Sequence, residues 1–180
     1  CDFVIRIEGT DGSRVVVQER YEVMRAMFLK DTEMVDAYVN EVDADTPVFK
    51  EIDLVLQFLP EGGGHGLQEN YETYETGLLR YGNANPEAAD FDSLADYMFT
   101  EDGVEIRIPW QLLNFSNPSE MMIHDDYYEH YGVENLHIDE MWVGLGLGEE
   151  NEYRIPMAAF LLEGWGKTVT YHERLKESYY

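Results

Sequence analysis

Two β-strands and the turn between them are encoded in Phe3-Val4-Ile5-Arg6-Ile7-Glu8-Gly9-Thr10-Asp11-Gly12-Ser13-Arg14-Val15-Val16-Val17. Phe3, Ile5 and Ile7 are apolar at every second position, which is the period of a strand with one buried face. The Gly, Asp and Ser residues at 9–13 are typical of a turn, and an apolar run follows at once. This stretch therefore predicts an antiparallel hairpin.

The same alternation recurs along the rest of the chain and predicts further short strands. These segments are 52–58, 104–108, 136–147, 154–162 and 167–171. Many short strands separated by turn residues favour a sandwich or a barrel over a parallel sheet with crossover helices. We predict a mostly β fold, an antiparallel, jelly-roll-like β-sandwich with long loops and at most one or two short helices. The length fits a single domain over residues 1–180.

The charge of the chain limits its partners. Against 37 Asp and Glu stand 12 Lys and Arg, a formal net charge of −25, while 44% of the residues are hydrophobic. An acidic surface repels phosphate, so nucleic acid and anionic membranes are not expected partners. The longest apolar stretch, 155–162, is too short to insert into a bilayer. The apolar content indicates a folded domain rather than an acidic disordered tail.

Cys1 is the only cysteine, so the chain forms no internal disulfide and no zinc site that needs several thiolates. It stands directly before the first strand pattern, with neither an initiator Met nor a basic and then apolar leader. We expect the C-terminal part of a longer protein, whose other domains are partners of this one. A lipidated Cys1 at the start of a mature lipoprotein is the alternative.

Two long irregular segments, 60–70 and 82–96, are expected to be surface loops that carry function. The second holds Asp90, Asp92 and Asp96, and carboxylates in a flexible loop are ligands that Ca²⁺ prefers. We name these three as candidate ligands of a structural calcium ion. The alternative is a solvated acidic loop in which Asp92 caps a short helical turn.

A second polar cluster, His124-Asp125-Asp126 with His130, has donor types that suit zinc or a non-haem metal. Its spacing does not place the two histidines on one helical face, so turn chemistry is the alternative. We take His124, Tyr127 and Tyr128 as candidate ligand-contacting residues, with packing as the other explanation for the tyrosines.

Exposed aromatic rings are a further candidate binding feature, because sugar rings stack on flat aromatic faces while nearby carboxylates bind hydroxyls. Trp142 lies in a strand pattern whose Val143, Leu145 and Leu147 already supply one apolar face, so its ring is expected to point outward. Trp165 stands between two glycines in a turn. The alternative is that both rings fill gaps at the edges of the sandwich.

Catalytic signatures are lacking. No spacing singles out the carboxylate pair that a glycosidase needs, and no Gly-x-Ser-x-Gly nucleophile turn occurs. We expect a noncatalytic protein, with a glycan-active enzyme as an alternative.

The run 104–113, Val-Glu-Ile-Arg-Ile-Pro-Trp-Gln-Leu-Leu, resembles the Glu-x-x-Ile-Pro-Trp/Phe-x-x-Leu signature of family 9 carbohydrate-binding modules and DOMON-related β-sandwiches. The segments 74–83 and 171–176 look like the C-terminal domain of large bacterial surface proteins. The resemblance implies an extracellular or cell-surface carbohydrate-binding module, and a structural calcium ion. The residues that match the signature, Glu105, Ile108, Pro109, Trp110 and Leu113, are mainly scaffold positions in that family. A structural or protein-interaction sandwich without sugar binding is the alternative.

Overall fold

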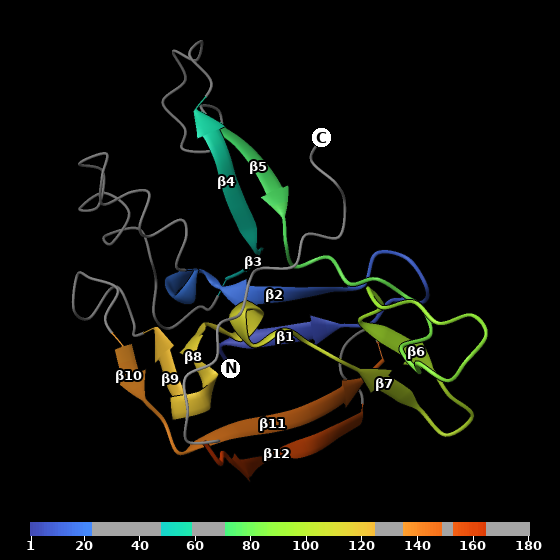
Figure 1. Cartoon of the computed structure of the whole chain (residues 1–180). Coiled ribbons are helices and arrows are strands. Elements are labelled where there is room, and N and C mark those ends of the chain that lie inside the picture. Colours follow the sequence, from blue (N-terminus) through green and yellow to red (C-terminus); the bar gives the residue numbers. More distant parts are fainter. Residues whose placement is uncertain (23–47, 59–70, 125–134, 149–152, 165–180) are drawn as a thin grey trace.

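The structure, a computed structural model, describes residues 1–22, 48–58, 71–124, 135–148 and 153–164. Short strands dominate these ranges, and the helical segments among them are single 3₁₀ turns (Figure 1). In chain order the elements are β1 (Phe3–Arg6), β2 (Arg14–Gln18), η1 (Glu19–Tyr21), β3 (Phe49–Glu51), β4 (Asp53–Phe58), β5 (Tyr71–Glu75), β6 (Tyr97–Phe99), β7 (Val104–Ile106), η2 (Trp110–Leu113), β8 (Phe115–Asn117), η3 (Pro118–Glu120), β9 (Met122–His124), β10 (Asn135–His137), β11 (Glu140–Leu147) and β12 (Tyr153–Leu161).

All pairings between these strands are antiparallel. They form two three-stranded sheets, β1-β2-β3 and β10-β9-β8, and three two-stranded ribbons, β4-β5, β6-β7 and β11-β12. The prediction of a mostly β, antiparallel fold is confirmed. The arrangement of the sheets as the two layers of a sandwich stays a prediction.

The N-terminal hairpin forms as its sequence indicates. Phe3 lies opposite Val17 and Arg6 opposite Arg14, which leaves residues 7–13 for the turn. Gly9 and Gly12 adopt φ angles of +78° and +82° there, a region that glycine enters without the steric cost of a Cβ atom.

The edge of β2 is shared by two segments that are distant in sequence. β3 pairs with Val16–Gln18, while residues 77–79 pair with the first residues of β2 through an antiparallel bridge between Arg14 and Leu78. The Val15 amide donates to the Gly77 carbonyl at 2.8 Å, and a Cβ atom added to Gly77 would lie 2.5 Å from the Val15 carbonyl oxygen. Only glycine allows the two backbones to approach this closely.

The main core cluster lies against β2. Its buried members are Val15, Leu79, Tyr97 and Leu112. The partly buried side chains packed around them are Phe3, Ile7, Ile52, Ile108 and Leu113. Tyr97 is 1% exposed, and its hydroxyl donates to the Gly9 carbonyl at 2.8 Å, which ties β6 to the N-terminal turn.

Several expected strands have different bounds in the structure. The segment 136–147 divides into β10 and β11, because the Ile138 amide donates to Met121 and the Asp139 carbonyl accepts from Leu162. The segment 104–108 is a strand only to Ile106 and pairs with β6. The expected strand 167–171 and loop 60–70 lie outside the described residues.

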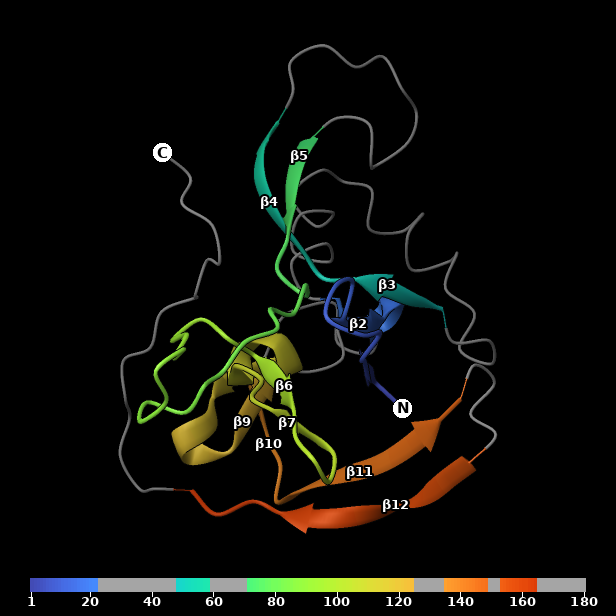
Figure 2. The same cartoon turned by 90° about the vertical axis from the view of Figure 1, so that its right-hand side faces the viewer.

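Two views at right angles place the β4-β5 ribbon at the top of the molecule and the β11-β12 hairpin at the bottom, with the β1-β2-β3 sheet between them (Figures 1 and 2). Within the described ranges, no helix has the length and apolar character that a membrane crossing needs.

Candidate functional site

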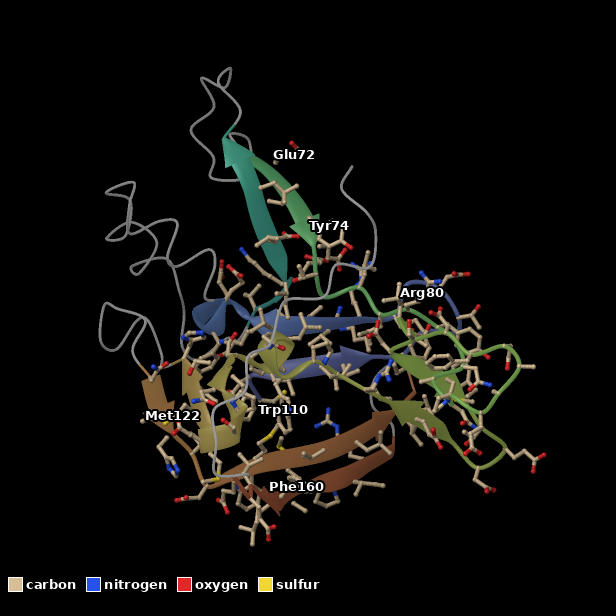
Figure 3. All side chains as sticks on the ribbon, in the orientation of Figure 1. Glu72, Tyr74, Arg80, Trp110, Met122 and Phe160 are labelled. Atoms are coloured by element: carbon tan, nitrogen blue, oxygen red, sulfur yellow. The ribbon has the colours of Figure 1, made fainter. Side chains whose placement is uncertain are left out.

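The β11-β12 hairpin presents two chemically different faces. Trp142 lies opposite Ala159 and Leu145 opposite Ile155, with a β-bulge between them that sets Pro156 and Met157 against Gly144. Since side chains alternate along a strand, the pairing separates two sets of residues. The Trp142 face comprises Glu140, Trp142, Gly144, Gly146, Arg154, Met157, Ala159 and Leu161. The opposite face, called the aliphatic face after most of its side chains, includes Met141, Val143, Leu145, Leu147, Ile155, Ala158 and the aromatic Phe160. Figure 3 shows Phe160 on this hairpin.

Trp142 stands exposed on its face with a fixed orientation. Its side chain is 58% exposed, and its indole Nε1 donates to Glu140 Oε1 at 3.0 Å. This hydrogen bond satisfies the polar edge of the ring and restrains its rotation, so the flat surface stays available to a partner. Glu140 can still accept hydrogen bonds from a ligand, because a carboxylate has about four acceptor positions.

The strand beyond Trp142 places two glycines on the same face. Gly144 and Gly146 lack side chains, and the spacing of a strand puts Gly146 roughly 13 Å from Trp142. A Cβ atom on Gly144 would lie 2.9 Å from Met157 Cγ, so the Met157 side chain passes close over this position. Arg154 lies opposite Gly146. The face therefore combines an aromatic ring, an acceptor at one end and a cationic donor at the other.

His124, the other candidate ligand contact within the described residues, lies on a different sheet. It ends β9 opposite Asn135 of β10, and its backbone amide donates to Asn114 at 2.9 Å. Its ring Nδ1 is buried and has no hydrogen-bond partner among the described residues. Burial lowers the pKa of His124, because the charged imidazolium loses its hydration. His124 and Trp142 are thus not neighbours in one sheet.

Three other candidates, Trp165, Tyr127 and Tyr128, lie outside the described residues. The same holds for Asp125, Asp126 and His130, so the proposed transition-metal cluster is described only at His124. These candidates stay predictions.

The candidate calcium ligands each bind a protein donor. Asp92 Oδ2 accepts from Arg80 Nε at 2.7 Å, and Asp92 Oδ1 accepts from the Leu94 amide at 2.9 Å, which closes an Asx turn. Asp96 is buried, and its Oδ2 accepts from the Arg80 amide at 2.8 Å. Asp90 Oδ1 accepts from Asn83 Nδ2 at 2.9 Å.

These hydrogen bonds connect both ends of the loop 80–97 to its middle. Within the described ranges, no three His, Cys, Asp or Glu side chains are grouped as a metal site would require. The capping role considered for Asp92 matches its contact with Leu94, although the segment is a turn rather than a helix. The calcium site itself stays a prediction.

The sequence interpretation missed a second exposed aromatic surface beside this loop. The rings of Tyr81 and Phe99 are 42% and 43% exposed, with their centroids 5.8 Å apart, and both contact the buried Tyr97 ring. The alternation of Tyr97 and Phe99 was a signal, but three residues are too few for a confident strand prediction. Trp110, a residue of the quoted signature, packs edge-on against Phe115 at 4.7 Å and remains partly exposed.

Comparisons of the chain with models of protein families, with curated proteins and with solved structures found no match. The geometry of the described residues is accordingly the basis for a functional proposal.

Proposed function

We propose that this chain is a noncatalytic carbohydrate-binding module and that the Trp142 face of β11-β12 is its binding surface. The observation that carries the proposal is the exposed Trp142 ring held through Nε1 by Glu140 at 3.0 Å. A sugar stacks its C–H face on such a ring and directs its hydroxyls to groups at the rim. Glu140 would accept from a hydroxyl and Arg154 would donate to one.

Beyond Met157, which lies over Gly144, the exposed Gly146 leaves room for a further sugar ring along the strand, and this favours an extended oligosaccharide over a single sugar. The Trp142 face is formed by two adjacent strands, so it suits a shallow surface contact rather than an enclosed pocket. A contact of this kind holds a ligand through stacking and a few polar contacts.

We further propose an extracellular or cell-surface location and a structural calcium ion at Asp90, Asp92 and Asp96. The sequence resemblance supports both, and the carboxylate oxygens of the loop support the calcium ion alone. Calcium would have to compete with Arg80 for Asp92. A shift of the melting temperature between EDTA and millimolar calcium, absent in Asp90→Asn with Asp92→Asn, tests the ion directly.

A glycan-array screen of the purified chain tests the proposed function. We expect binding to a defined set of oligosaccharides, its loss in Trp142→Ala and its retention in Val143→Ala. Val143 is a matched control, because it is 57% exposed on the neighbouring position of the opposite face. Absence of binding to every glycan, or equal loss in both variants, would contradict the proposal.

One observation favours a second function, that of a protein-interaction domain. The aliphatic face of the same hairpin is exposed, which a sugar-binding role does not require. Glycan binding and protein contact would use opposite faces, so the two functions are separable by substitution.

A further inference from the structure

The exposed ring of Trp142 lies at an acidic end of its hairpin. Asp139 and Glu140 stand at the start of β11, and the Leu162 amide donates to the Asp139 carbonyl at 2.8 Å, which places Glu163 at the same end. Asp139, Glu140 and Glu163 are all exposed. Their negative charges attract a cation, and the net charge of −25 on the chain adds an attraction of the same sign at longer range.

The basic residue of the hairpin is too far from the ring to cancel this attraction. Arg154 is the only Lys, Arg or His in residues 138–164. Its backbone position lies roughly 13 Å along the hairpin from that of Trp142. Charges in solution are screened over about 8 Å at physiological salt, so Arg154 has little effect at the ring. The nearby His137 lies beside Asp139, with Nδ1 3.7 Å from Oδ1.

Glu140 is held at the rim of the stacking surface. Its Oε1 accepts from the indole Nε1 of Trp142 at 3.0 Å, so the carboxylate lies at the edge of the ring rather than over its flat side. A pyranose stacked on the indole directs its equatorial substituents outward past that edge. A substituent that donates a hydrogen bond there reaches the carboxylate, and a charged donor gives a bond about twice as strong as a neutral donor does.

We infer, on the basis of the proposed function, that the Trp142 face binds oligosaccharides of amino sugars whose amino groups are free and protonated. The indole supplies the stacking contact, and Glu140 pairs with an ammonium group at the rim of the stacked sugar. A hydroxyl in the same place gives only a neutral hydrogen bond, and an acidic sugar is repelled by Glu140 and by the net charge. N-acetylation removes the charge of the amino group and therefore removes the preference.

Calorimetric titration of the whole chain with the tetramers of glucosamine and of N-acetylglucosamine tests this specificity. At a mildly acidic pH that keeps the amino groups protonated, we expect the glucosamine tetramer to bind about threefold or more tightly at low salt, and the difference to shrink as salt rises. Glu140→Gln should give the two tetramers about equal affinity, because the amide keeps an acceptor for Nε1 and loses the charge. Glu105→Gln, which removes an exposed carboxylate from β7, is the matched control and should leave the preference unchanged.

Several outcomes would overturn the inference while the proposed function stands. They are equal affinity for the two tetramers with loss of both in Trp142→Ala, equal weakening of both by Glu140→Gln, and binding of other glycans but of neither tetramer. Equal effects of Glu140→Gln and Glu105→Gln on the glucosamine tetramer would also overturn it and would assign that binding to the overall charge of the chain. Absence of binding to both tetramers and to every glycan would contradict the proposed function as well.

Discussion

Tyr97→Phe and Tyr97→Ala test the assignment of the main core cluster. The Tyr97 ring is buried and contacts Tyr81 and Phe99 at centroid distances of 5.6 and 6.0 Å, while its hydroxyl donates to Gly9. Removing only the hydroxyl breaks one neutral hydrogen bond, which contributes about 0.5–1.5 kcal/mol. Because Gly9 is exposed, water can replace the lost donor, so we expect a cost near the lower end of that range.

Removing the whole ring has a larger expected cost. Tyr97→Ala leaves a cavity worth about 3–5 kcal/mol and also loses the contacts with two neighbouring rings. For a chain of this length, 1 kcal/mol shifts the melting temperature by about 2–4 °C. Urea and thermal unfolding of both variants give the comparison, with Tyr81→Phe as the partly exposed control, expected within about 0.5 kcal/mol of the unsubstituted chain. Equal and small costs for Phe and Ala at position 97 would refute the core described above.

Three further outcomes are expected. Gly77→Ala should destabilise the fold by about 2 kcal/mol or more, because its Cβ atom would lie 2.5 Å from the Val15 carbonyl oxygen. Gly103→Ala is the control: its Cβ atom would meet no atom within 4 Å, so the unfolding free energy should change by less than about 0.5 kcal/mol. Similar changes for the two variants in urea unfolding would contradict the pairing of residue 77 with β2. Burial lowers the pKa of His124 from 6.5, so the unfolded chain binds the proton more tightly than the folded chain, and the free energy of unfolding should fall as the pH drops below 6.5. His124→Gln should flatten that part of the pH profile of the unfolding free energy, and parallel profiles of the two proteins would argue against a buried ring. Salt should raise the melting temperature by screening a net charge of −25, and a melting temperature insensitive to salt would count against self-repulsion.

The elements that could be predicted from sequence are those with local signals. The N-terminal hairpin carries strict alternation before a glycine-containing turn and an apolar run after it, and β11 and β12 are long enough for their apolar pattern to stand out. Such patterns predict the secondary structure of a segment, because the period of a strand and the conformational preferences of turn residues are set by a few neighbouring residues.

Partners and burial could not be predicted in the same way, because they depend on contacts between distant segments. The edge of β2 takes up both β3 and residues 77–79, and β6 and β7 are only three residues each. The candidate calcium ligands are an example from the site. The sequence shows three carboxylates close together, but it does not show that Arg80 donates hydrogen bonds to Asp92 and Asp96. Alternation places Trp142 on the face opposite Val143 and Leu145, whereas the exposure of each face depends on what the rest of the fold places against it.

The indole N–H signal of Trp142 in a heteronuclear NMR spectrum tests the proposed binding surface most directly. Its assignment comes from the signal that disappears in Trp142→Phe, and the Trp110 signal serves as an internal control. Addition of an oligosaccharide that binds the chain should shift the Trp142 signal, because Nε1 lies beside the stacking face and donates to Glu140, and should leave the Trp110 signal in place. Binding that leaves the Trp142 signal unmoved would contradict the assignment of the Trp142 face as the carbohydrate site.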